Sequence, residues 1–140
     1  MTWFLWSLLS AVFAAATALL AKLGVADVDP NLATAIRTTV VLFLAWAISI
    51  CSGSHHQFST LDRRSVGLLV ASGIATGLSW LCYFRALSTG PASKVAPIDK
   101  LSVVFVILLA WPMLGEKLTP GKLLGGGLIV AGAIVLALTR

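Results

Sequence analysis

The sequence predicts an all-α integral membrane protein that crosses the bilayer about five times. Of its 140 residues, 59% are hydrophobic and only 11% are charged, whereas charged residues make up about a quarter of a typical soluble domain. The mean hydropathy is +0.99. Polar residues are clustered and separate apolar runs of roughly 20 residues, the length of a helix that crosses a hydrocarbon layer about 30 Å thick. We therefore expect extensive contact with membrane lipid and little mass outside the bilayer.

Local signals set the limits of the helices. Asp29–Pro30 and Thr119–Pro120 each pair a capping residue with a proline suited to the first helical turn. The first apolar run is longer than the core of a usual signal peptide and follows no Lys or Arg, so we expect a retained helix. Polar residues 51–64 form the longest loop. Within a single domain over residues 1–140, the expected helices lie at about 3–23, 30–50, 65–87, 93–114 and 120–138.

The basic residues near the helix ends bear on orientation. An odd number of helices places the chain ends on opposite sides of the membrane, and four basic residues fall on each side. Arg63, Arg64, Lys117 and Lys122 share the side of the N-terminus, and Lys22, Arg85, Lys94 and Arg140 lie on the other. This balance fits a chain that inserts in both orientations, but chance can also produce it. The adjacent pair Arg63 and Arg64 weakly favours a cytoplasmic N-terminus.

Glycines recur at four-residue spacing in two of the predicted helices. Gly73 and Gly77 lie in the third helix, and Gly121 and Gly125 lie in the fifth. This spacing places small residues on one helix face and lets helices approach closely in lipid. The glycines serve either packing inside one chain or the seam of a dimer, and the fifth helix, which is richest in glycine, is the better candidate for a seam.

Several charged and aromatic residues fall inside the predicted spans, toward one side of the membrane. Such charges usually pair with each other or border a pathway. One interpretation is an ion pair of Asp99 with Arg37 or Arg85; another is a polar layer along a substrate path, with Asp99 as a proton or cation site. A third is exposure at the membrane interface. Three basic residues and one acid would suit an anionic or zwitterionic substrate. The candidate path or gate residues are Arg37, Trp80, Tyr83, Arg85, Asp99 and Lys100.

Several function classes are not indicated by the sequence. It contains no glycine-rich nucleotide loop, no HExxH or GxSxG motif and no paired carboxylates, so we expect neither an enzyme nor a cofactor. His55 and His56 are adjacent but have no partners for a metal site, and Cys51 and Cys82 are far apart. The basic residues are scattered rather than gathered on one face, which argues against a nucleic-acid partner.

The second half of the chain carries recognisable motifs. Residues 86–97 read ALSTGPASKVAP, residues 114–119 read LGEKLT, and a glycine-rich last helix follows. These stretches resemble the EamA family of the drug/metabolite transporter superfamily. Residues 80–85 (WLCYFR) and 98–103 (IDKLSV) resemble its small members. The resemblance implies that the chain is one EamA-type repeat of five helices, whereas typical members carry two such repeats in inverted orientation.

The resemblance implies a secondary transporter of small metabolites in the cytoplasmic (inner) membrane, working by alternating access. Two oppositely oriented copies would rebuild the inverted pair, so we expect a homodimer, antiparallel in the favoured version. A parallel dimer or an oppositely oriented paralogous partner are alternatives. Rival functions are a non-transporting assembly subunit or scaffold and a flippase of lipid-linked substrates. Small four-helix multidrug pumps carry an acidic residue in their first helix, but residues 3–21 contain no Asp or Glu.

Overall fold

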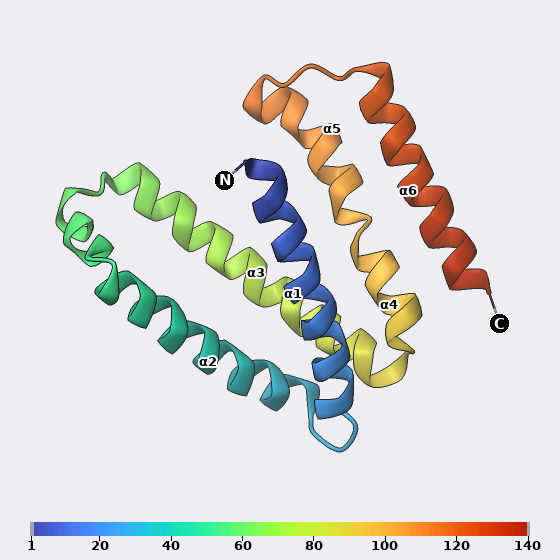
Figure 1. The fold of residues 1–140 in the computed structure, drawn as a ribbon, viewed down its shortest axis with the longest axis horizontal. Helices are drawn as coiled ribbons and strands as arrows, with labels where there is room; N and C mark the ends of the chain where they lie inside the picture. The colour runs from blue at the N-terminus through green and yellow to red at the C-terminus, as the bar shows by residue number, and fades with distance from the viewer. Residues whose placement is uncertain (1, 140) are drawn as a thin grey trace. The chain divides into compact units, whose positions relative to one another are not determined.

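The computed structural model of the protein describes residues 2–139, and within this range it contains helices but no strand (Figure 1). Five segments are long and apolar enough to cross a membrane, and α4 and α5 together form one of them. The predicted fold class is therefore confirmed. The elements are α1 (Trp3–Gly24), α2 (Pro30–Cys51), the 3₁₀ helix η1 (Ser54–Thr60), α3 (Arg63–Thr89), α4 (Ala92–Asp99), α5 (Ser102–Leu114) and α6 (Pro120–Leu138).

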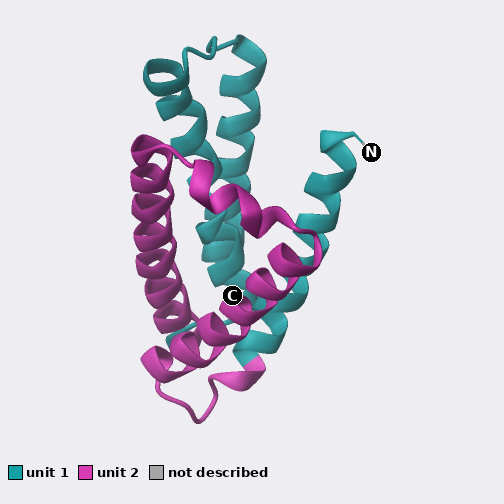
Figure 2. Cartoon of the chain, turned by 90° about the vertical axis from the view of Figure 1, so that its left-hand side faces the viewer, with its two compact units in different colours: residues 1–22, 89–140 teal, residues 23–88 magenta. Residues whose placement is uncertain are grey.

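The chain divides into two compact units (Figure 2). The first unit contains residues 1–22 and 89–140, and the second unit contains residues 23–88. The first unit therefore holds most of α1 together with α4, α5 and α6. The second unit holds α2, η1 and α3, which follow one another without interruption. The two native cysteines, Cys51 and Cys82, both lie in the second unit, where they are free thiols with exposed side chains.

The two predicted caps are present at the starts of α2 and α6. The Asp29 carboxylate accepts hydrogen bonds from the backbone N–H groups of Asn31 at 2.8 Å and Leu32 at 3.2 Å. The Thr119 hydroxyl accepts one from the N–H of Lys122 at 3.3 Å. A proline follows each cap, at a position whose N–H would have no partner within the helix. The capping signals in the sequence are therefore confirmed.

The predicted loop 51–64 contains a short helix that its polar composition did not predict. Gly53 has a φ of 73° and ends α2 in the left-handed region, where glycine is favoured. The 3₁₀ helix η1 follows at once and packs against α2. Asp62 then accepts a hydrogen bond from the N–H of Ser65 at 3.2 Å. The hydroxyl and N–H of Ser65 hold the pKa of the exposed Asp62 carboxyl below its ordinary value of 3.8.

The fourth membrane span consists of two helices, which corrects the expectation of one continuous helix over 93–114. Pro97 lies inside α4; it has no N–H to donate, and a proline ring in a helix clashes with the carbonyl four residues earlier, here that of Ser93. The hydrogen bonds tighten after it, since the N–H of Leu101 bonds to the carbonyl of Ile98 at 3.0 Å, three residues back. The span therefore changes course between α4 and α5.

Helix α6 lies beside α4 and α5 in the first unit. Its buried Gly126 allows a close approach, since a Cβ atom added there would lie 3.6 Å from the Cδ1 atom of Ile107 on α5. The Lys94 ammonium group on α4 donates a hydrogen bond to the carbonyl of Ala137 in the last turn of α6, at 3.0 Å. This bond satisfies a carbonyl that has no partner within its own helix. Glycine packing and one lysine thus fix α6 against its neighbours.

The helices expose an unusually large apolar surface. Leu69, Phe43 and Leu128 have exposed fractions of 64%, 70% and 73%. The buried apolar side chains are few and mostly small, as at Ala18, where the exposed fraction is 8%. A soluble protein rarely exposes apolar patches of more than a few hundred Å². Lipid, or lipid together with another protein chain, must cover this surface.

Candidate functional site

Arg37 carries its charge within the second span. It follows Pro30 by seven residues, which is about 10 Å along a helix, and its side chain is half-buried. The guanidinium carbon lies 4.3 Å from the ring centroid of Trp80 and 5.4 Å from that of Phe84 (both on α3). These rings are four residues apart and so share one face of α3. We call Arg37, Trp80 and Phe84 the arginine–aromatic cluster; it has the geometry of cation–π contacts.

None of the three carboxylates of the second unit forms an ion pair with Arg37. Asp29 caps α2 and Asp62 caps α3, and Asp27 lies in the turn between α1 and α2. Within residues 23–88, no carboxylate oxygen forms an ion pair with Arg37. A charge inside a membrane span is costly unless it is paired or lines a polar cavity. In its own unit, Arg37 therefore contacts the rings of Trp80 and Phe84, and Tyr83 interacts with its charge electrostatically.

A shallow groove of ≈ 320 Å³ opens between α2 and α3, in the turns that also contain Arg37 and Trp80. The three threonines that line it each donate a hydrogen bond to the carbonyl four residues earlier in α2. The bond from Thr34 to Pro30 is 2.8 Å long, the bond from Thr38 to Thr34 is 2.7 Å, and the bond from Thr39 to Ala35 is 3.0 Å. These threonines therefore present methyl groups and already bonded hydroxyls to the groove. The lining residues are Asn31, Thr34, Ala35, Thr38, Thr39, Leu42, Gly77 and Leu81.

The two charged candidates of the fourth span lie at the break between its helices. Asp99 is the last residue of α4, and its carboxylate lies 3.5 Å from the ammonium nitrogen of Lys100. The side chains are 38% and 58% exposed, in that order. Exposed neighbours of this kind contribute little to stability. An ion pair of Asp99 with Arg37 or Arg85, one of the interpretations of the sequence, remains a prediction, since both arginines belong to the second unit.

The six candidate residues thus fall in both units. Arg37, Trp80, Tyr83 and Arg85 belong to the second unit, and Asp99 and Lys100 belong to the first. Arg37 meets Trp80 directly, whereas Tyr83 is half-buried and Arg85 is exposed. The sequence analysis missed Phe84 and Thr34, which are buried with exposed fractions of 3% and 6%. The four-residue spacing of Phe84 from Trp80 was the signal that could have found it.

The four glycines expected at a packing face border open space in this chain. A Cβ atom added at Gly73, Gly77, Gly121 or Gly125 would meet nothing within 4 Å. The glycine that approaches another helix is Gly126 instead. The role of the four in helix packing or a dimer seam remains a prediction.

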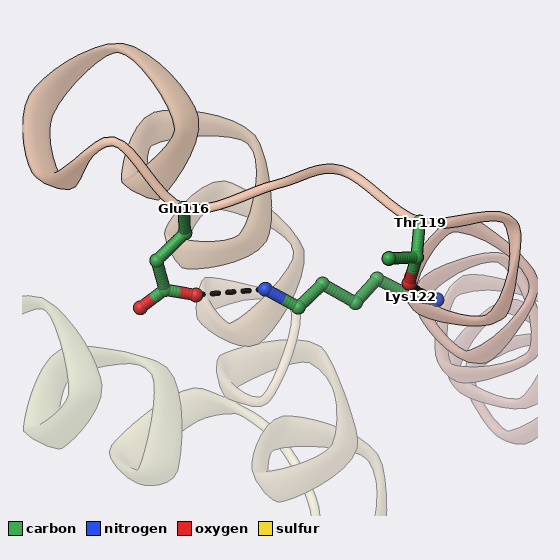
Figure 3. A network of polar contacts seen from close by, with 3 residues as sticks. All are labelled: Glu116, Thr119 and Lys122. Carbon is green, nitrogen blue, oxygen red and sulfur yellow. Dashed lines mark hydrogen bonds and ion pairs between the residues drawn. The ribbon is translucent and has the colours of Figure 1, made fainter.

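The connection between α5 and α6 holds a small polar network (Figure 3). The ammonium nitrogen of Lys122 lies 2.8 Å from a carboxylate oxygen of Glu116, and the backbone N–H of Lys122 bonds to the Thr119 hydroxyl. Both charged side chains are about half exposed, at 40% for Lys122 and 52% for Glu116. The network closes the turn at a helix end, so we assign it a structural role.

Comparison with known proteins identifies the family of the chain. The sequence profile of the EamA-like transporter family matches residues 1–138. The chain belongs to this family. An uncharacterized transporter of the cobO 3′ region of Sinorhizobium sp. is 48% identical over 136 residues, which covers 97% of this chain and 96% of the relative. This EamA protein is therefore a multi-pass membrane protein built for transport.

Two other relatives show the range of substrates in related proteins. A multidrug transporter of Pseudomonas aeruginosa is 34% identical over 104 residues, or 71% of the EamA chain and 93% of the relative. A protein of Erwinia tasmaniensis, named as a 4-amino-4-deoxy-L-arabinose-phosphoundecaprenol flippase subunit, is 43% identical over 65 residues, or 45% and 51% of the two chains. No solved structure matches the chain.

Proposed function

We propose that this EamA protein is a secondary transporter that moves small metabolites across the cytoplasmic membrane by alternating access, as an antiparallel homodimer. The observation that carries the proposal is the arginine–aromatic cluster, a cation within a membrane span that contacts Trp80 at 4.3 Å. Ionisable residues within spans usually mark substrate or ion pathways. The family and its transporter relatives support the same reading. Arg37 and Trp80 would then line the path.

The five spans of the chain are the reason for proposing a dimer. Transporters with inverted repeats bind substrate where the two repeats meet, near the middle of the membrane. One chain here has five spans, and two copies in opposite orientation would supply the second repeat. The open glycine faces of α3 and α6 support this arrangement, because helices associate in lipid through such small residues.

Transport can be tested without knowing the substrate. The purified protein would be reconstituted in vesicles loaded with a mixture of small polar metabolites, and release of each compound would be followed by mass spectrometry. We expect selective release, and a loss of about ten-fold or more in Arg37→Gln, the cost of one charge-assisted contact. Arg64→Gln, at the start of α3, is the matched control. If no compound is released by the unmodified protein, the alternative of a non-transporting scaffold gains support.

The orientation of the chain is tested by reporters fused after residue 140, one active only in the cytoplasm and one only outside it. Strong signals from both would support dual insertion and the antiparallel dimer. A signal from only one would exclude that dimer, and the search would turn to a parallel dimer or a partner protein of opposite orientation.

A lipid-linked substrate is the second candidate. The groove between α2 and α3 is lined mainly by apolar side chains and threonine methyl groups, and one relative is named as a flippase subunit for a phosphoundecaprenol-linked sugar. A substrate with a long apolar chain needs such a surface. Vesicles that contain a fluorescent polyprenyl phosphate would show whether the protein moves it between leaflets, which a transporter of soluble metabolites would not do.

A further inference from the structure

The guanidinium group of Arg37 has donors that the aromatic rings cannot satisfy. A cation–π contact uses the face of the planar group, whereas its five N–H donors point outward from the edge. Trp80 and Phe84 meet Arg37 through their rings. Within residues 23–88, the structure shows no hydrogen bond from this side chain to an acceptor. The edge of the guanidinium is therefore ready to bind oxygen atoms supplied from elsewhere.

The charges around the cluster favour an anion. The second unit holds three carboxylates, and the two that form hydrogen bonds, Asp29 and Asp62, do so with backbone N–H groups at the starts of helices. Arg85 follows Phe84 on α3 and adds a second positive charge toward the same end of that helix. In a medium of low dielectric constant, an unpaired cation attracts a counter-ion strongly. The charge of Arg37 itself disfavours a cationic ligand.

We propose that Arg37, backed by Trp80 and Phe84, is an oxyanion site that binds the carboxylate or phosphate group of the transported substrate. The proposal rests on the transport function inferred above and names the chemical class of its substrate. Arginine binds such groups through two parallel N–H···O bonds, which fix orientation as well as charge. The groove of ≈ 320 Å³ is lined by other residues of the same turns of α2 and α3, and none of Arg37, Trp80 and Phe84 lines it, so the proposal concerns the cluster alone.

Binding is tested on the full-length protein in detergent, by thermal unfolding at constant ionic strength. The probes are glycerol 3-phosphate and succinate as anions, with choline as the cation. Ligands that bind the folded state raise the melting temperature, so we expect stabilisation by the anions and none by choline. Equal stabilisation by choline, or no stabilisation by glycerol 3-phosphate, succinate or decyl phosphate, would overturn the proposal.

Variants assign the binding to the cluster. We expect the apparent affinity for the anions to fall about ten-fold or more in Arg37→Gln and by a smaller factor in Arg37→Lys, which keeps the charge but loses the fork. Trp80→Leu should also weaken binding, since it removes the surface that orients the guanidinium. Arg64→Gln should bind as the unmodified protein does. If Arg37→Gln and Arg37→Lys both retain full affinity, the site is elsewhere and the proposal fails.

A lipid and a soluble metabolite can present the same phosphate group, and a second pair of probes separates these sources. Decyl phosphate carries the anion on an apolar chain, and decyltrimethylammonium is its cationic control. Stabilisation by decyl phosphate but not by glycerol 3-phosphate indicates a lipid-borne substrate, whereas stabilisation by both indicates a soluble one. In either case Arg37→Gln should remove the effect.

Binding and transport can fail separately. Binding that depends on Arg37, without release of any metabolite from vesicles, would leave the oxyanion site intact and overturn the transport function. Transport that survives Arg37→Gln with unchanged rate would leave the transport function intact and overturn the oxyanion site. The oxyanion site would also be overturned if Arg37 formed an ion pair with Asp99. In that case the Asp99→Asn variant would bind the anions and the unmodified protein would not.

Discussion

Asp29 and Asp62 act in the same way at two helix starts. The first N–H groups of a helix have no acceptor within it, and each carboxylate accepts hydrogen bonds from these groups at the start of its helix. A negative charge there also interacts favourably with the helix dipole. Two acidic residues that could be mistaken for substrate ligands therefore have a structural explanation, and neither of them forms an ion pair with Arg37.

Removal of the α2 cap should destabilise the protein. We expect Asp29→Ala to lower the free energy of unfolding by about 1 kcal/mol, because the N–H groups of Asn31 and Leu32 lose their acceptor. Asp27→Ala is the matched control, since it removes a carboxylate from the same turn without touching the cap. Unfolding of the protein in mixed micelles would measure both, and equal effects would contradict the role of Asp29.

The cap at α3 should make stability depend on pH. The pKa of Asp62 is lowered on folding by its hydrogen bonds with Ser65, from an ordinary value of 3.8. Its contribution is therefore complete above that value and is lost as the pH falls through the lower, folded value. We expect Asp62→Asn to melt at a lower temperature than the unmodified protein at pH 7. The difference should shrink below pH 3.8, and a difference that is constant with pH would count against this assignment.

At the scale of elements, the broken fourth span is the departure from a simple helix bundle. Pro97 and the tightened turn after it separate α4 from α5. Non-helical backbone at membrane depth is tolerated where it is covered by protein or lines a cavity, and transporters use discontinuous helices at their sites. The break also places Asp99 and Lys100 at the junction of the two helices.

Repair of this break should slow transport. Pro97→Ala restores a backbone N–H within the helix, so α4 and α5 should approach one continuous helix and the melting temperature should rise. If the break is a hinge, the rate of release from vesicles should fall about five-fold or more, because substitutions at hinge residues alter the rate of a conformational step. Pro112→Ala, near the end of α5, is the control and should leave the rate unchanged. A faster or equal rate in Pro97→Ala would exclude a hinge.

The elements were largely predictable from the sequence, and the site was predictable only in part. Apolar runs and caps such as Asp29 depend on neighbouring residues, so local patterns placed the spans to within a few residues. The break after Pro97 depends on hydrogen bonds that can shift by one residue, which composition does not report. The contact of Arg37 with Trp80 joins two helices, and η1 lies between them. The contact depends on how α2 and α3 pack against each other. The sequence could therefore name Arg37 and Trp80 as candidates, but it could not show that they meet each other and Phe84.

At the scale of the whole molecule, the exposed surface indicates what the chain still needs to contact. Within their own units, a Cβ atom added at Gly73 or Gly77 of α3, or at Gly121 or Gly125 of α6, would meet nothing within 4 Å, whereas Gly126 approaches Ile107 on α5. Adjacent glycines on α6 therefore face different surroundings. Gly126 serves packing inside one chain, and the face that holds Gly121 and Gly125 remains the predicted seam with a second one.

This difference predicts opposite outcomes for neighbouring substitutions. Gly126→Leu should destabilise the single chain by about 1–3 kcal/mol, the usual cost of overpacking, because only a methyl group fits before Ile107. Gly125→Leu should leave the stability of the single chain unchanged and lower the dimer fraction measured by cross-linking in membranes. If Gly125→Leu leaves the dimer fraction unchanged, α6 does not form the seam.

The free thiol of Cys51 offers a site for attaching a spin label. It is exposed and ends the second span, so a nitroxide attached there would sit at one face of the membrane once Cys82 is replaced by serine. In an antiparallel pair of chains, the two nitroxides would lie on opposite faces, at least about 30 Å apart. In a parallel pair they would share a face, and the spin–spin distance would not be bound by the bilayer thickness. One native side chain therefore lets electron paramagnetic resonance read how two copies are arranged.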